Sequence, residues 1–501
     1  MKEQNNRIKK LAGQTMVYGM GSILPKLLNF AILTPFYTRV LMRGSYGTVT
    51  EIYAYVVVIM VILTFGMETG FFRFCREEKS VGKVYTHAFT VVFVLAMIWV
   101  TGVMVFLKPL AHVIRYDSHP EYLKWFSWII ALDVIVSVPF AKLRQQEKAM
   151  RFAGLKLASV VINIILVFLF LLVFPWIDKM PDHSLPAWLY RSGIGVGYVF
   201  IANLATSALM FLLIIPELKD LSWSFDRKLM IKMLRFSSPL VIVGIAGAIN
   251  DVADKIILKF MWPDHATALA NVGVYGAGYR LAVIMTLYIQ MFRYAFEPFM
   301  FSIYGRKDDK ETYARIMNYF VILGLLIFLM VSFYMDGIKY FLGKNFQEGI
   351  GITPIILMAN LFLGIYYSLS VWYKVKDKTL YAAVIASLGA LITLVINFVF
   401  IPKIGYWASA WATLTCYVTM TICSWMWGRK IYKIPYEVNK ILGWLIWAVL
   451  LFVISLVLRP ESLLWRLVLN TVLLLIFAGV VAWREKGLVQ LVLARIGLNK
   501  K

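Results

Sequence analysis

The chain has 501 residues, of which 61% are hydrophobic and 16% are charged. Soluble domains are nearer half apolar and a quarter charged, so this composition excludes an ordinary soluble protein. The formal net charge of +24 would suit a nucleic-acid-binding protein, but the basic residues lie mostly between apolar runs and not on one face beside stacking aromatic residues.

The cysteines and histidines argue against a metal centre and a disulfide framework. The three cysteines, Cys75, Cys416 and Cys423, are scattered along the chain, and the five histidines have no spacing typical of metal ligands. We therefore expect no metal site and no cofactor.

The apolar residues form runs of about twenty residues, the length that a helix needs to cross a hydrocarbon core about 30 Å thick. The sequence therefore predicts an all-α integral membrane protein with fourteen transmembrane helices. The expected spans are 12–37, 47–72, 84–107, 123–143, 155–176, 192–216, 236–260, 273–300, 314–336, 350–373, 379–401, 404–427, 441–458 and 464–483. The first run lacks a small-residue cleavage site, so we expect it to remain as a membrane helix.

The basic residues indicate the orientation of these spans. With the N-terminus in the cytoplasm, most of the 51 lysines and arginines fall in cytoplasmic segments and far fewer in outer segments. This asymmetry is the positive-inside pattern, and removing one span would destroy it. We therefore expect both termini in the cytoplasm, with connections too short for a folded extramembrane domain.

A short internal repeat relates the two halves of the chain. Residues 22–70 align without gaps with residues 251–299. The aligned pairs include Gly44 with Gly273, Tyr46 with Tyr275, Gly47 with Gly276, Lys26 with Lys255, and Glu68 with Glu297. Because each half contains six spans, the two copies share one orientation, which is typical of parallel repeats in transporters. We expect two six-helix lobes related by a pseudo-twofold axis, 1–216 and 217–430, followed by a helix pair with a tail, 431–501.

Several segments resemble the polysaccharide transporter branch of the multidrug/oligosaccharidyl-lipid/polysaccharide exporter superfamily. The segments that carry the resemblance are 35–41, 46–47, 66–74, 143–148, 272–281, Asn397, 401–402 and Gly405. The resemblance extends over about residues 10 to 430, and it rests on the order and spacing of these segments rather than on one specific motif.

The resemblance implies a MATE-like fold in which two lobes surround a cavity that opens alternately to each face of the membrane. The implied cargo is an oligosaccharide on a polyprenyl diphosphate, moved from the cytoplasmic to the outer leaflet of a bacterial cytoplasmic (inner) membrane during surface polysaccharide synthesis. The implied partners are this lipid-linked oligosaccharide, membrane lipids, H⁺ or Na⁺ as a coupling ion, and polysaccharide polymerases and glycosyltransferases, with no nucleic acid.

The first span carries a polar stripe on an apolar helix, formed by Thr15, Tyr18, Ser22, Lys26 and Asn29. A charged side chain inside a membrane helix is costly and usually faces a cavity or a partner. We therefore interpret Lys26 as a cation on the cavity wall that attracts the diphosphate, with an ion pair to an acid on another helix as the alternative. Arg39, near the outer mouth, is either a substrate contact or an interfacial anchor.

The eighth span carries polar residues through most of its length, from Arg280 in the outer half to Arg293 and Glu297 in the inner half. Arginine binds phosphate through two parallel hydrogen bonds, so both arginines are candidate substrate contacts. Because Arg293 and Glu297 are four residues apart, a local ion pair is the alternative for Arg293.

Acidic residues inside spans are candidates for ion coupling. In the seventh span, Asp251 and Lys255 are four apart and favour a local pair, which leaves Asp254 to balance another cation or take up an ion. Asp133, in the fourth span, has no basic neighbour in sequence, and a neutral carboxyl is expected there. The candidate diphosphate-binding residues are thus Lys26, Asn29, Arg39, Lys255, Arg280 and Arg293, and the candidate ion-coupling residues are Glu68, Asp133, Asp251, Asp254 and Glu297.

The main competing functions are other kinds of export and membrane enzymes. A peptidoglycan-precursor flippase and a cation-coupled multidrug exporter belong to the same superfamily, although a drug exporter favours acids where the first span has Lys26. A membrane glycosyltransferase needs acidic residues in an early outer loop, and residues 38–47 contain none. A polysaccharide polymerase typically has one large outer loop, which the expected spans leave no room for. We therefore expect no enzymatic activity and no catalytic residue.

Overall fold

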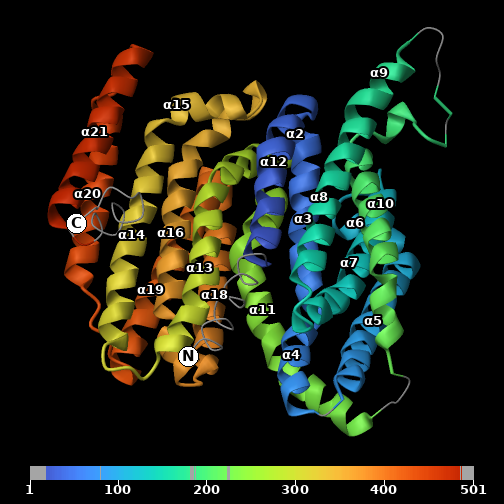
Figure 1. Ribbon diagram of the computed structural model, residues 1–501. Helices are drawn as coiled ribbons and strands as arrows, with labels where there is room; N and C mark the ends of the chain where they lie inside the picture. The colour runs from blue at the N-terminus through green and yellow to red at the C-terminus, as the bar shows by residue number, and fades with distance from the viewer. Residues whose placement is uncertain are drawn as a thin grey trace. The chain divides into compact units, whose positions relative to one another are not determined.

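The computed structural model describes residues 18–78, 80–180, 185–186, 188–222, 226–485 and 487, and every regular element in these ranges is a helix (Figure 1). Eleven helices are long and apolar enough to cross a membrane, and the bent pair of α12 and α13 makes a twelfth span if it is counted as one. The prediction of an all-helical integral membrane protein is confirmed.

Each of the fourteen expected spans overlaps a described helix, but two of them fall outside this count. The first span is helical from Tyr18 to Val40, and its expected residues 12–17 lie outside the described part of the chain. The other is α19 (Tyr406–Ile431), which is long enough but rich in threonine, serine and tryptophan. The number fourteen and the cytoplasmic position of both termini therefore stay predictions.

The chain divides into two compact units, Met1–Gly273 and Val274–Lys501. The helices of the first unit are η1 (Asn29–Leu33, a π-helical stretch), α2 (Thr34–Val40), α3 (Arg43–Thr64), α4 (Met67–Glu77), α5 (Val81–Val105), α6 (Leu107–Val113), α7 (Glu121–Gln145), α8 (Ala149–Phe168), η2 (Leu169–Val173), α9 (Phe174–Asp178), η3 (Ser192–Ile194), α10 (Gly197–Ile214), η4 (Ile215–Asp220) and α11 (Arg227–Met261).

The second unit begins within α12 (His265–Leu281). Its further helices are α13 (Val283–Ile303), α14 (Asp309–Phe333), α15 (Met335–Ile338), η5 (Lys339–Phe341), η6 (Lys344–Ile352), α16 (Thr353–Leu369), α17 (Val371–Val375), α18 (Thr379–Ile404), α19, α20 (Val438–Val457) and α21 (Leu463–Arg484).

One helix is central in each unit. In its most apolar stretch, α7 is 78% buried, and the segment Lys344–Val375, which contains α16, is 72% buried. By contrast, the stretch that contains α8 is 11% buried and α21 is 22% buried. A helix that keeps so much apolar surface exposed needs an apolar solvent, so α8 and α21 are positioned to face lipid. The two central segments are the fourth and tenth expected spans, which hold the same place in the two halves of the repeat.

The seventh expected span forms α11, and local sequence explains where it begins and ends. The Asp226 carboxylate accepts hydrogen bonds from the backbone N–H groups of Lys228 (2.9 Å) and Leu229 (3.1 Å), which caps the helix. The bond from Leu229 and then that from Lys228 lower the pKa of Asp226, because they stabilise its ionised form. The helix ends at Met261, shortly before Pro263, because the residue that precedes a proline is disfavoured in a helix.

Because α11 packs against α3, it belongs to the first unit, and the boundary between units falls at Gly273 and not near residue 216. The expected lobes 1–216 and 217–430 and the expected helix pair 431–501 follow from the sequence repeat, whereas the two units follow from contacts within the chain. The two divisions are not the same kind of division, and the expected one stays a prediction.

Two glycines of the repeated motif lie where α3 crosses the first turns of α12. A Cβ atom at Gly47 would lie 1.7 Å from the carbonyl oxygen of Leu269, and one at Gly273 would lie 2.2 Å from the carbonyl oxygen of Arg43. Small residues allow membrane helices to approach this closely. The glycines therefore have a packing role in addition to any role in the repeat.

Replacing Gly47 with alanine is expected to destabilise the first unit by about 1–3 kcal/mol, because the new methyl group must displace backbone. The matched control is Gly102→Ala in α5, where a Cβ atom meets nothing within 4 Å and alanine favours the helix by up to about 1 kcal/mol. Thermal unfolding of the purified variants measures both changes. Equal midpoints for the two variants would contradict the close crossing.

Candidate functional site

The expected site residues are distributed over both units. The first unit holds Lys26, Asn29, Arg39, Glu68, Asp133, Asp251, Asp254 and Lys255, and the second holds Arg280, Arg293 and Glu297.

Lys26 lies on the first described helix, directly after the buried Pro25, and its side chain is exposed. Three residues on, Asn29 begins the π-helical stretch, and its side-chain oxygen is buried without a hydrogen bond to a described residue. An unsatisfied buried acceptor is unusual, and it marks Asn29 as a residue with capacity to bind a donor. Of the expected polar stripe, Ser22 bonds the carbonyl oxygen of Tyr18 (2.9 Å), and Thr15 lies outside the described residues.

Arg39 is exposed, and its guanidinium donates a hydrogen bond to the carbonyl oxygen of Pro35, one turn earlier (3.0 Å). This contact is compatible with the alternative interpretation of Arg39 as an interfacial anchor. A contact between Arg39 and the substrate stays a prediction.

Glu68 and Asp133 each bond a residue from another helix. The Glu68 carboxylate of α4 forms an ion pair with Arg144, at the end of α7. Asp133 of α7 accepts a hydrogen bond from the Ser207 hydroxyl of α10 (2.8 Å) and interacts electrostatically with Lys156 of α8. Asp133 therefore has a basic neighbour in space, which its own sequence surroundings do not reveal.

The three candidate site residues of α11 pair differently from the expectation. The Lys255 ammonium lies 3.0 Å from the Asp254 carboxylate and donates to the backbone carbonyl of Asp251 (2.9 Å). Asp254 is thus not left over, as the spacing of four residues implied, because it is the ion-pair partner of its sequence neighbour. Asp254 and Lys255 are buried and Asp251 is exposed. Their roles in transport stay predictions.

In the second unit, the expected eighth span is broken. Helices α12 and α13 are bent by 47° around Ala282. Arg280 lies in the last turn of α12, where the free carbonyl groups of a helix end favour a cation. Its side chain is exposed and, among the described residues of its unit, has no hydrogen bond or ion pair. Within the described part of this unit, the guanidinium donors of Arg280 are therefore available for a ligand.

Arg293 and Glu297 form the local pair that was the alternative expectation, with a nitrogen–oxygen distance of 3.5 Å. The same Glu297 oxygen lies closer, at 2.7 Å, to the Lys374 ammonium of α17. The Arg293 guanidinium lies 4.1 Å from the centre of the Tyr367 ring, within the range of a cation–π contact. Arg293 is therefore engaged within the unit, and a substrate contact by this residue stays a prediction.

The sequence did not single out a buried ion pair between α3 and α11. The Glu51 carboxylate is fully buried, lies 3.0 Å from the Lys259 ammonium and accepts a hydrogen bond from the Tyr116 hydroxyl (2.6 Å). Lys259 also donates to the carbonyl of Ile114 (2.6 Å). The partners of this pair come from α11 and from the segment that follows α6, so the position of Glu51 along α3 does not by itself reveal its burial.

Sequence reasoning also missed a second cluster, where the end of α7 and the start of α8 meet η4. The buried Glu217 carboxylate pairs with Arg151 (2.9 Å) and Lys142 (3.4 Å), and Lys142 also pairs with Asp220 (2.6 Å). The only sequence signal was the resemblance of segment 143–148 to a family loop. The cluster connects three helices and is best explained as structural. Within the described ranges, no group of three or more possible metal ligands is close enough to hold an ion.

Comparison with known families and sequences gives one match. The model of a family described as polysaccharide biosynthesis protein matches residues 11–304. No curated protein matches the sequence.

Several solved structures share the fold. The lipid II flippase MurJ in an inward closed conformation is 14% identical over 93% of this chain and 98% of its own, with a TM-score of 0.70. An inward-facing multidrug resistance MATE family transporter of the MOP superfamily is 14% identical over 83% of this chain and 97% of its own, with a TM-score of 0.65. The Vibrio cholerae MATE transporter VcmN, in a mutant form, is 13% identical over 86% and 98%, with a TM-score of 0.60. At this level of identity, the likeness concerns the fold.

Proposed function

Because the chain belongs to the family of polysaccharide biosynthesis proteins, we propose that it is a flippase that moves a lipid-linked oligosaccharide across the membrane. The cargo is an oligosaccharide on a polyprenyl diphosphate, carried from the cytoplasmic to the outer leaflet of a bacterial cytoplasmic membrane. Its helices make the chain a multi-pass membrane protein, and transport is the step of such a pathway that this architecture supports best.

The observation that carries this proposal is the combination of family and fold. A polysaccharide pathway builds its sugars on one side of a membrane and uses them on the other, so it needs a protein that moves the intermediate. The fold is shared with a lipid flippase and with multidrug transporters. Transport, and not catalysis, is the activity that both comparisons support.

The charged residues support an anionic cargo. Arg280 has its donors available within its unit, and Lys26 places a cation on the first helix. Arginine holds a phosphate through two hydrogen bonds, whereas lysine attracts it as a point charge. The other candidates, Asn29, Arg39, Lys255 and Arg293, belong to the same proposal. Coupling to H⁺ or Na⁺ through the acids Glu68, Asp133, Asp251, Asp254 and Glu297 is a further part of it.

We further propose alternating access, in which the lobes 1–216 and 217–430 rock about the site while the lipid tail stays in the membrane. Polysaccharide polymerases and glycosyltransferases are the expected partners that use and supply the cargo.

Reconstitution tests the proposal. Proteoliposomes that contain a short-chain polyprenyl-diphosphate oligosaccharide are treated with an impermeant glycosidase, which reports the lipid that reaches the far leaflet. The protein is expected to move a large fraction of the lipid within minutes, and protein-free vesicles are expected to move almost none. Parallel vesicles with a peptidoglycan precursor or a cationic dye test the two competing exporters.

If the protein moves no oligosaccharide lipid with or without an imposed ion gradient, the proposal is wrong. Transport of the peptidoglycan precursor or of the cationic dye in those same vesicles would then identify which alternative holds.

A further inference from the structure

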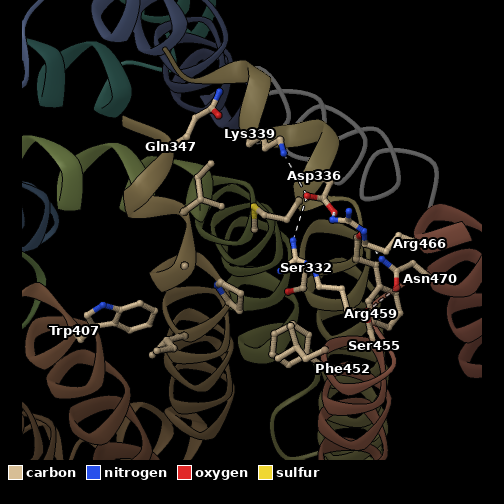
Figure 2. Close-up of a pocket in the computed structure, with 17 residues that line it drawn as sticks. Ser332, Asp336, Lys339, Gln347, Trp407, Phe452, Ser455, Arg459, Arg466 and Asn470 are labelled. Carbon is tan, nitrogen blue, oxygen red and sulfur yellow. Dashed lines mark hydrogen bonds and ion pairs between the residues drawn. The ribbon is translucent and has the colours of Figure 1, made fainter. Parts of the chain in front are cut away.

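A cavity of about 580 Å³ lies in the second unit (Figure 2), and neither Arg280 nor the Arg293–Glu297 pair lines it. Its walls come from the end of α14, from α15, η5 and η6, and from α16, α19, α20 and α21. Nothing in the family match or in the proposed transport assigns it a role.

The cavity lies where five helices reach one of their ends. Helices α14 and α20 end at Phe333 and Val457, and α16, α19 and α21 begin at Thr353, Tyr406 and Leu463. The ends of membrane-spanning helices lie near the boundary between hydrocarbon and water. The cavity is therefore at the depth of lipid headgroups.

One side of the cavity carries three cations around a single acid. The Asp336 carboxylate lies 2.8 Å from Arg466, 3.4 Å from Lys339 and 3.5 Å from Arg459. No other acidic side chain lines the cavity, so within the described lining the cluster has two positive charges in excess. Such an excess in a partly apolar site favours the binding of an anion.

Some hydrogen-bond donors of these cations bond no described residue. A guanidinium has five N–H donors. The Arg466 guanidinium bonds Asp336 and the carbonyl of Glu461 (2.9 Å), while its Nε atom is buried with no hydrogen bond to a described residue. The buried hydroxyl of Ser332, which lines the same cavity, also has none. The Arg459 side chain is 57% exposed, and among the described residues it forms an ion pair with Asp336 alone.

The other side of the cavity is apolar. Trp407 lies across from the ion pairs of Asp336 in Figure 2, and Phe452 and Leu456 of α20 continue the apolar wall. A free inorganic anion needs no such wall, whereas a lipid presents a charged headgroup and an acyl or prenyl chain together. The arrangement of the two sides therefore matches an anionic amphiphile.

We propose that this cavity binds the phosphate of a membrane lipid, with Lys339, Arg459 and Arg466 as its ligands and the apolar wall against the first part of its chain. The bound lipid would connect α20 and α21 to the end of α14. This proposal stands independently of the proposed transport function, since it requires only a phosphate on a lipid at this depth.

Lipid titration tests the site. The full-length protein, purified in mild detergent and stripped of lipid, is titrated with phosphatidylglycerol, and bound lipids are counted by native mass spectrometry. The Lys339→Gln/Arg459→Gln variant is expected to bind the tightest lipid at least about tenfold more weakly, because it loses two charge-assisted contacts. Arg459→Lys is expected to keep most of the affinity.

Lys403→Gln is the matched control, because Lys403 is an exposed cation at the end of α18 that does not line the cavity. Its affinity for phosphatidylglycerol is expected to equal that of the unmodified protein. Equal affinities for all four proteins, with equal thermal stabilities, would overturn the proposal. Inorganic phosphate at millimolar concentration is expected not to displace the lipid; displacement would identify a free-anion site and overturn the lipid assignment.

Discussion

Replacing Arg280 with glutamine is expected to lower the initial rate of lipid-linked oligosaccharide transport by roughly 10- to 100-fold. Hydrogen bonds between charged groups contribute about 1.5–3 kcal/mol each, and about 1.4 kcal/mol corresponds to a factor of ten. Because Arg280 has no hydrogen bond or ion pair with a described residue of its unit, its removal leaves no buried partner unsatisfied. The effect should therefore appear in transport and not in stability.

The variants that accompany this measurement separate charge from geometry. Arg280→Lys keeps the positive charge but not the planar guanidinium. Its transport rate is therefore expected to lie between that of the unmodified protein and that of Arg280→Gln. Lys26→Gln is expected to act in the same direction as Arg280→Gln. Lys232→Gln, at an exposed cation near the start of α11, is expected to transport normally. If Arg280→Gln folds and transports like the unmodified protein, Arg280 does not bind the cargo.

Replacing Lys259 with methionine is expected to destabilise the first unit by about 3–5 kcal/mol, because it leaves the Glu51 carboxylate buried without its cation. The carboxylate is fully buried and would keep the hydrogen bond from the Tyr116 hydroxyl but no cation within ion-pair distance among the described residues. Methionine has a similar length to lysine, so packing changes little. Unfolding of the purified protein in increasing denaturant measures the loss.

The double variant Glu51→Gln/Lys259→Met is expected to recover most of the lost stability. Glutamine removes the buried charge and still accepts a hydrogen bond from the Tyr116 hydroxyl. Lys232→Met, an exposed lysine on the same helix, is the control and is expected to change stability by less than about 0.5 kcal/mol. A small loss for Lys259→Met alone would show that water reaches Glu51 and that the pair is not buried in the membrane.

Together these two predictions distinguish two uses of a charge inside a membrane. Arg280 is exposed, bonds no described residue of its unit and is expected to bind a ligand, whereas Lys259 is 3% exposed and forms an ion pair with Glu51. A charged residue in a span is therefore not sufficient to identify a binding site, since its partners within the protein decide between the two uses.

The sequence by itself determined the class of the protein and the positions of its helices. Long apolar runs can be stable only in a hydrocarbon solvent, and in that solvent a backbone must satisfy its own hydrogen bonds, so runs of about twenty apolar residues predict membrane helices without knowledge of their packing. The order of the family-like segments likewise pointed to the polysaccharide biosynthesis family, and the match over residues 11–304 confirmed it.

Only the tertiary structure decided how the charges pair. Spacing along a helix predicted the Arg293–Glu297 contact correctly, because residues four apart are neighbours on one helix. It could not predict Lys374 beside Glu297, Lys156 near Asp133, or Lys259 beside Glu51, since these partners come from other helices. It also misassigned Asp254, whose carboxylate turns toward the adjacent Lys255. Ion pairs form between whichever charged groups lie within a few ångströms, and distances between helices are set by packing, which a single helix does not encode.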